Sequence, residues 1–213
     1  MSTHATASKQ WTEADLARLP TENGVRQRGL EVTRLDTFID AAFAFSLTIL
    51  VISFDAIPTS YDEMIEAVKR IPAFFMSFTV LMLFWVGHRG WSRRYGLETR
   101  QTIFLSLSII FVTLVYVYPL RIIFEAMFAD WTDGYFPSAF RITQRHELQG
   151  MFLFYSSGSL IMSLLFWNLY RSALKCKDAL NLNEAEQLAT KVSMMNFVSL
   201  AIFGAGRGFL DGE

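Results

Sequence analysis

The chain has 213 residues and a mass of 24.4 kDa, with 52% apolar, 15% aromatic and only 18% charged residues. An average soluble domain carries about 25% charged residues, and the mean hydropathy of this chain is +0.30, which disfavours a soluble protein. The net charge of −1 gives no basic field for nucleic acid, and the single cysteine excludes an intramolecular disulfide and any multi-cysteine metal site.

The N-terminal residues 1–33 are predicted to form a polar cytoplasmic tail. No secretory signal opens the chain, and the first apolar stretch begins near Leu35. Within the tail, a short helix is expected around Glu13–Leu19 with Thr12 as its N-cap, and the remainder is expected to be mobile. Residues 34–213 are predicted to form one transmembrane domain.

The first predicted span runs from about Leu35 to Phe54 and carries two carboxylates, Asp36 and Asp40. Pro58 closes it, because proline cannot continue a helix. A charged side chain at the centre of a bilayer costs about 2.5–3.5 kcal/mol on insertion scales, and less toward an end. Asp40 should therefore face protein and have a partner.

Large apolar side chains recur at helical spacing along this first span. They are Phe38, Phe45, Ile49 and Ile52. On a helix they share one face, with Asp40 roughly on the opposite side. Ordinary helix packing explains such a stripe as well as a specialised surface does.

Four further spans are predicted, at about Ile71–Trp91, Gln101–Met127, Leu148–Tyr170 and Val192–Gly206. The first three contain uninterrupted stretches of 17, 20 and 23 residues without Asp, Glu, Lys or Arg. About 18 such residues suffice to cross a hydrocarbon core of ~30 Å. The last span is the weakest, with 15 uncharged residues, so the prediction is an all-α integral membrane protein with about five transmembrane helices.

Two connections between spans have recognisable patterns. The segment Tyr61–Arg70 is predicted to be a short amphipathic surface helix, and Pro72 lies in the first turn of the next helix, where a missing N–H costs little. Residues 129–145 are predicted to be a loop, with Trp131, Tyr135 and Phe136 at the membrane interface. In the tail near the first span and in the connections between spans, twelve Lys and Arg residues lie on the side of the N-terminus and five on the other. This asymmetry predicts a cytoplasmic N-terminus.

The second span ends near the same membrane depth as Asp40. His88 and Trp85 lie three residues apart near this end. The sequence predicts an Asp40–His88 contact, with Arg34 about one and a half turns below Asp40. The simplest interpretation of such a cluster is interfacial structure without chemistry, and a proton-handling role is the alternative.

Two motifs resemble the transmembrane protein 175 family of potassium channels. The sequence RLDTFID at 34–40, followed by a small and apolar helix, resembles the first-helix signature Arg-x-x-x-Phe-Ser-Asp of this family. The sequence WVGH at 85–88 resembles its Trp-x-x-His-His motif. The two motifs have the expected order and separation, and the resemblance covers roughly residues 34–192.

The resemblance implies a subunit of six helices. Four such subunits surround one pore, which is lined by the first helix of each. In this family the constriction consists of rings of large apolar side chains. By the pattern of the family, Phe45 corresponds to the principal constriction, and Ile49 and Ile52 to the following rings. Thr48 corresponds to the position whose hydroxyl ring is linked to potassium preference.

The resemblance also implies a network that braces the pore helix from behind. Its members are Arg34, Phe38, Asp40, Trp85 and His88. The expected function is a potassium-selective or potassium-preferring cation channel with passive conduction, without enzymatic activity, cofactor or metal site. The expected partners are further copies of the chain in a homotetramer, membrane lipids and the permeant potassium ions. The expected location is a prokaryotic inner membrane, with residues 34–213 as the channel domain.

The sequence departs from the pattern of the family at Ile39, in place of serine, at Arg89, in place of the second histidine, and at Phe45, where isoleucine or leucine is usual. No apolar stretch for a sixth helix follows Phe209 and Leu210. Phe45, Ile39 and the missing last helix favour the alternative of a non-conducting membrane scaffold or interaction protein that retains the channel fold. A secondary transporter or an intramembrane enzyme is less favoured, because no broken helices or convergent polar groups near the midplane are visible.

Overall fold

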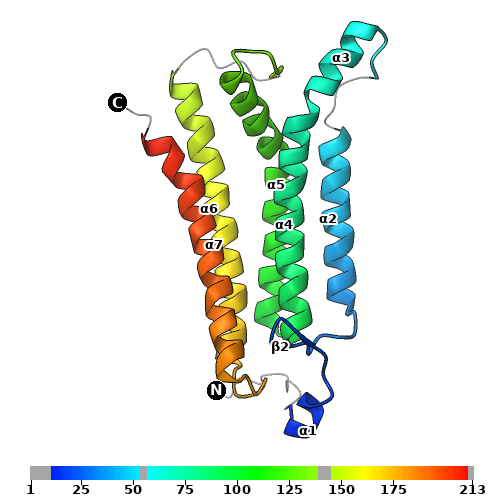
Figure 1. The fold of residues 1–213 in the computed structure, drawn as a ribbon, viewed down its shortest axis with the longest axis vertical. Coiled ribbons are helices and arrows are strands. Elements are labelled where there is room, and N and C mark those ends of the chain that lie inside the picture. Colours follow the sequence, from blue (N-terminus) through cyan, green and yellow to red (C-terminus); the bar gives the residue numbers. More distant parts are fainter. Residues whose placement is uncertain (1–10, 53–56, 139–144, 211–213) are drawn as a thin grey trace.

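The computed structural model describes residues 11–52, 57–138 and 145–210, with the side chains of 145, 148 and 200–210 excepted. Long helices lie side by side in a bundle, and a short N-terminal segment crosses beneath it (Figure 1). In chain order the elements are α1 (Glu13–Leu16), β1 (Thr21–Glu22), β2 (Val25–Arg26), α2 (Arg34–Ile52), α3 (Tyr61–Lys69), α4 (Ile71–Tyr95), α5 (Arg100–Trp131), α6 (Arg145–Lys175) and α7 (Glu184–Leu210).

Four helical segments of the described residues are long and apolar enough to cross a membrane. They are Arg34–Ile52, Tyr61–Tyr95, Arg100–Trp131 and Gln149–Lys175. They confirm the first four predicted spans, and the chain is an integral membrane protein. The observed helices extend beyond the uncharged stretches because charged residues continue a helix readily once it has left the hydrocarbon core.

The fifth predicted span, Val192–Gly206, lies within α7, which is not among those four segments. The side chains of 200–206 lie outside the described residues, as do residues 53–56 between the end of α2 and Pro58. The structure therefore establishes four candidate spans, where the sequence predicts about five.

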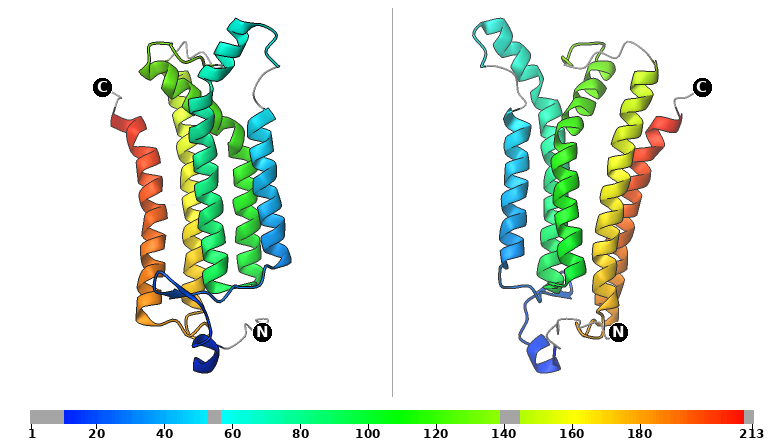
Figure 2. Two further views of the ribbon diagram at one scale, coloured as in Figure 1. Left: turned by 45° about the vertical axis from the view of Figure 1, so that its right-hand side comes forward. Right: turned by 180° about the vertical axis from the view of Figure 1, so that it is seen from behind.

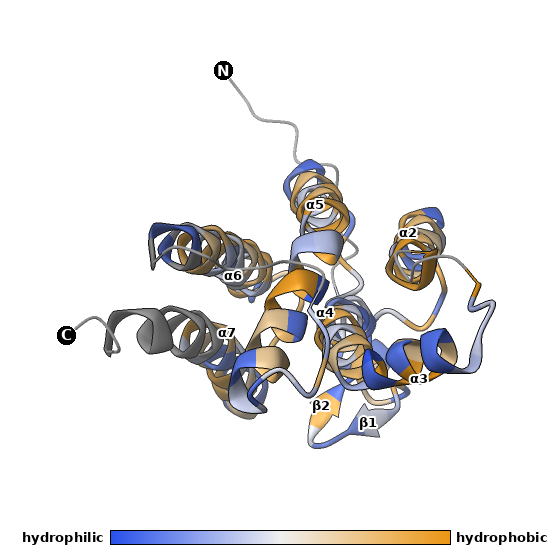
Figure 3. Ribbon diagram, turned by 90° about the horizontal axis from the view of Figure 1, so that it is seen from above, coloured by the Kyte–Doolittle hydropathy of each residue, from blue (hydrophilic) through white to orange (hydrophobic). Residues whose placement is uncertain are grey.

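The helices form two groups around a central α5. α2 and α4 pack against one side of α5, while α6 packs against the other and carries α7 along its length (Figure 2). The lower core cluster, around Trp91, Ile109 and Phe166, joins α2, α4, α5 and α6. The upper core cluster, around Leu50 and Val117, joins α2, α4 and α5. Viewed from above, α2 stands at the edge of the bundle (Figure 3).

The N-terminal segment from Trp11 onward is packed beneath the bundle. Its predicted helix is confirmed in a shorter form, Glu13–Leu16, and Thr12 and Asp15 form a reciprocal capping box at its start. The expectation of a mobile tail does not describe this segment. The backbone N–H of Gly29 donates to the carbonyl oxygen of Arg93 at 2.9 Å, so the segment is bonded to the end of α4. A Cβ on Gly29 would overlap the carbonyl oxygen of Ser92, so this approach requires glycine.

A buried ion cluster, which we call the Glu186 clamp, fixes the same segment to the start of α7. Arg28 donates through both terminal nitrogens to the two carboxylate oxygens of Glu186, at 3.0 and 2.9 Å, and Arg26 binds the same carboxylate at 3.1 Å. Asn183 accepts from the backbone N–H of Glu186 at 2.8 Å and caps the helix. Burial opposes ionisation of Glu186, but the hydrogen bonds from Arg28 and Arg26 outweigh it and lower the pKa of this carboxyl to about 2.

The predicted surface helix is confirmed as α3, whose start is capped by the side chain of Ser60. After α5 the chain turns through Asp133 and Gly134, both with positive φ. Tyr135 is exposed there, as expected for an interfacial aromatic residue. The remainder of the predicted loop, residues 139–144, lies outside the described residues.

Candidate functional site

One face of α2 is buried against the rest of the chain. Its residues are spaced four, three and four positions apart, which places them on one side of a helix. They are Ile39, Phe43, Ser46 and Leu50, each no more than 2% exposed. Ile39 and Phe43 join the lower core cluster and Leu50 the upper one. This face therefore holds α2 against α4 and α5.

The opposite face of α2 is uncovered in the single chain. Phe38, Phe45 and Ile52 are 56%, 58% and 73% exposed. Ala41 and Thr48 are also exposed and complete a stripe with alternating spacings of three and four. We call these five residues the α2 stripe.

Three of the residues predicted to share an apolar face lie in the α2 stripe, and the fourth does not. Ile49 is half-buried and packs against the upper core cluster. The hydroxyl of Thr48 lies on the uncovered side and donates to the carbonyl oxygen of Ala44 at 3.1 Å. Its oxygen retains acceptor capacity, because a hydroxyl carries two lone pairs.

Polar side chains join the lower end of α2 to α4. The indole Nε1 of Trp85 donates to Oδ1 of Asp40 at 2.7 Å. One turn lower, the hydroxyl of Ser92 donates to Oδ1 of Asp36 at 2.6 Å. Thr33 caps the start of α2, because its hydroxyl accepts from the backbone N–H of Asp36 and donates to the Asp36 carboxylate. Both carboxylates of the first span therefore have partners, as the sequence predicts for Asp40.

The predicted Asp40–His88 contact is wrong. His88 is 2% exposed, and its Nε2 pairs with the hydroxyl of Ser106 on α5 at 2.9 Å. Residues three apart on a helix differ by about 60° in direction. Trp85 therefore reaches α2 while His88 reaches α5, and the motif ties α4 to both neighbours instead of one.

The other predicted members of the network are placed differently. Within the described residues, Arg34 is exposed and makes no side-chain hydrogen bond or ion pair, and Phe38 belongs to the α2 stripe. Arg89, in the position of the second histidine of the motif, lies over the ring of Trp85 at 5.2 Å from its centroid. The geometry thus brings together Asp40, Trp85 and Arg89.

Two polar pairs are not predicted from the sequence. The first is Asp36–Ser92, which the spacing of the residues could have indicated. Asp36 lies four residues before Asp40, on the same face of α2, and Ser92 lies seven residues after Trp85, on the same face of α4. A contact between Asp40 and Trp85 therefore brings Asp36 close to Ser92. The second is a buried ion pair inside α5, in which Nε of Arg121 donates to Glu125 at 2.8 Å. An ion pair at i and i+4 neutralises both charges within one helix.

The fold and these contacts define a class of protein. It is a polytopic helical membrane protein whose first span is braced by polar contacts on one side and presents an uncovered stripe on the other. Such a stripe is a surface for lipid, for another subunit or for a pore.

Comparison with known proteins identifies the family. The family model described as "Endosomal/lysosomal potassium channel TMEM175" matches residues 34–119. A relative from Marivirga tractuosa named "Potassium channel" is 31% identical over 174 residues, which cover 79% of this chain and 70% of the relative. The fold also matches a crystal structure of a variant of the potassium channel MtTMEM175, solved in complex with a nanobody–MBP fusion protein. The TM-score is 0.77 and the sequence identity is 26%, and the match covers 90% of this chain and 86% of that one. This chain belongs to the TMEM175 family.

Proposed function

We propose that this protein is a passive potassium channel in which the α2 stripe of each subunit faces a shared pore. The observation that carries the proposal is the uncovered stripe on α2, the first helix of the region that matches the potassium channel family. A single helix cannot enclose a pore, so several copies are required. We propose four, in a homotetramer.

The constriction in this proposal is apolar. A ring of Phe45 side chains would be the narrowest point and Ile52 would form a further ring, with Ile49 at the edge of the lining. Narrow apolar rings control conduction by excluding water. Between the rings, Thr48 supplies hydroxyl oxygens that favour a partly dehydrated potassium ion. Asp40 and Trp85 would hold the pore helix in position from below.

We place the N-terminus in the cytoplasm of a prokaryotic cell, at its inner membrane. Lys and Arg residues are concentrated on the side of the N-terminal segment, as expected for a cytoplasmic side. In this arrangement α7 supplies a fifth span.

A second candidate function rests on Phe45. Four phenyl rings around one axis fill more of it than four aliphatic side chains do, which favours a non-conducting scaffold of the same fold. Ile39 gives no support to this candidate, because it is buried in the core cluster and not in the stripe.

The test is ion flux into liposomes that contain the purified protein, driven by a potassium gradient and repeated with sodium. We expect potassium flux to exceed sodium flux and to change in Phe45→Ile. Phe111→Ala is the matched control, because Phe111 is a 68% exposed phenylalanine on α5, and it should leave flux unchanged. A well-folded tetramer that passes no potassium, even as Phe45→Ala, would contradict the channel and support the scaffold.

A further inference from the structure

A cavity of about 410 Å³ lies low in the bundle, outside the α2 stripe. It is open to the outside and is lined by α4 on one side, by α7 on the other and by the β1–β2 turn. Three arginines of α4 are among its lining residues: Arg89, Arg93 and Arg94. Their place in one lining distinguishes them from the basic residues elsewhere at the same end of the bundle.

The lining of this cavity carries more positive than negative charge, with three arginines and one glutamate, Glu22. Arg94 donates to the hydroxyl of Ser193 at 3.2 Å, and Arg89 rests on the ring of Trp85. Among the described residues, none of the three arginines has an ion pair, although Glu22 also lines the cavity. The Glu186 clamp, in contrast, pairs its arginines with a carboxylate. A cavity with an excess of positive charge is suited to an anion.

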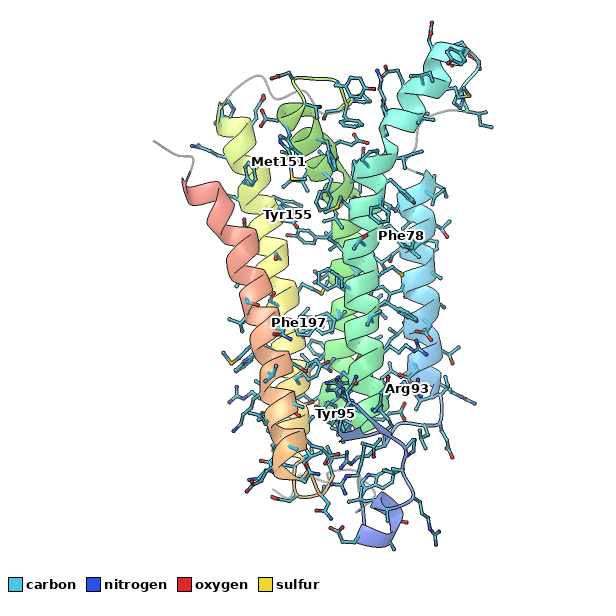
Figure 4. The ribbon with its side chains drawn as sticks, viewed as in Figure 1. Phe78, Arg93, Tyr95, Met151, Tyr155 and Phe197 are labelled. Carbon is cyan, nitrogen blue, oxygen red and sulfur yellow. The ribbon has the colours of Figure 1, made fainter. Side chains whose placement is uncertain are left out.

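The wall of the cavity changes character along α4. Toward the middle of the bundle it is apolar, with Val86, Tyr170 and Phe197. Figure 4 shows Phe197 projecting from α7 toward α4, and Arg93 near the lower end of α4. Gly90, also in the lining, has open space around it, since a Cβ added there would meet no atom within 4 Å. The cavity thus has a basic end and an apolar end.

We propose that this cavity binds a phosphate group, carried by an anionic phospholipid or free in solution. Guanidinium groups bind phosphate oxygens through pairs of parallel hydrogen bonds. Basic pockets between membrane-spanning helices at the cytoplasmic side are suited to phospholipid headgroups. Val86 and Phe197 would contact an acyl chain if the phosphate belongs to a lipid.

Binding is measured by calorimetric titration of the full-length protein in neutral detergent. The probes are dioctanoyl phosphatidylglycerol, zwitterionic dioctanoyl phosphatidylcholine and inorganic phosphate. A basic residue near a membrane surface contributes roughly a fivefold preference for an anionic lipid. The double variant Arg93→Gln/Arg94→Gln should therefore weaken binding about 25-fold.

Two further variants separate a site from general surface charge. Gly90→Leu adds a side chain where a Cβ meets no atom within 4 Å, so it takes up part of the cavity. It removes no charge and should also weaken binding. Arg100→Gln removes one exposed positive charge at the same end of the bundle but outside the cavity, and it should leave binding unchanged. If the double variant fails to fold, Gly90→Leu decides the question.

The outcomes distinguish the source of the phosphate. Binding of phosphatidylglycerol alone, weakened by the cavity variants, identifies a lipid site. Binding of inorganic phosphate, weakened in the same way, identifies a site for the free anion. Binding of neither anion, or binding that Arg100→Gln weakens as much as the cavity variants do, would overturn the proposal. Because titration does not depend on ion flux, its failure is distinct from failure of the channel proposal.

Discussion

The two faces of α2 are chemically similar but differ in what covers them. Phe43 and Leu50 are almost fully buried against α4 and α5, whereas Phe45 and Ile52 are more than half exposed. In water, hydrophobicity would separate a core face from a surface face. Within a bilayer the surroundings are apolar, so both faces of a helix can be apolar. The two faces differ in whether other helices of the same chain cover them. We therefore expect the covered face to determine the stability of the fold and the uncovered face to determine function.

The largest expected effect comes from a matched pair at the upper end of α2. Leu50→Ala removes a side chain that is 0% exposed and should cost about 2–5 kcal/mol through the cavity it leaves. Ile52→Ala, at a side chain 73% exposed, should change stability by less than about 0.5 kcal/mol. Denaturation in detergent micelles, followed by circular dichroism, measures both. Equal losses would show that the two faces are not distinct.

Adding volume should separate the faces in a second way. Ser46 is 1% exposed, so Ser46→Leu overfills the packed face and should cost about 1–3 kcal/mol. Ala41→Leu adds volume to the uncovered stripe and should preserve stability while reducing potassium flux, because it narrows the proposed pore. Thermal melting and liposome flux are measured on the same preparations. A destabilised Ala41→Leu variant with normal flux would contradict this assignment.

A smaller effect is expected where α2 is braced. Trp85→Phe keeps the aromatic ring but removes the 2.7 Å hydrogen bond to Asp40, at a cost of about 1 kcal/mol. Flux should change as well, since Asp40 lies on the proposed pore helix. Trp167→Phe is the control, because Trp167 lies on α6, away from α2. The bracing role is rejected if both variants conduct like the wild type.

The smallest change in stability is expected at Thr48. Thr48→Ala removes an exposed hydroxyl and should alter stability by less than about 0.5 kcal/mol. The ratio of potassium to sodium flux should nevertheless fall, because the pore would lose a ring of oxygens. Thr79→Ala removes a hydroxyl that bonds in the same way to its own helix on α4, and it should leave the ratio unchanged. Equal ratios in both variants would argue against a selective role for Thr48.

The sequence predicts the spans well because charge-free length is a direct requirement of the bilayer. It also predicts helix caps, as at Thr12, because capping depends on residues only three positions apart. Partner choice is less predictable. Hydropathy places Asp40, Trp85 and His88 at the same depth in the membrane. Which of these side chains meet depends on the rotation of each helix about its own axis. Trp85 and His88 point about 60° apart on α4, and hydropathy does not distinguish directions so close together.

Other features depend on contacts distant in sequence. Arg28 and Glu186 are separated by 158 positions, and each resembles an ordinary solvated surface charge in its own segment. The α2 stripe is predictable in outline, with Phe38, Phe45 and Ile52 on one face. Ile49 lies at its edge, because a helix of 3.6 residues per turn brings only part of the apolar set to the uncovered side.

The Glu186 clamp also bears on how the protein is made. Arg26 and Arg28 leave the ribosome early, whereas the carboxylate that neutralises them is synthesised only after α6. Throughout the insertion of the first spans these arginines remain hydrated and unpaired, since their partner does not yet exist. The N-terminal segment can dock only after the start of α7 has been translated. A chain that stalls before Glu186 therefore lacks the ion pairs that fix Arg26 and Arg28 beneath the bundle.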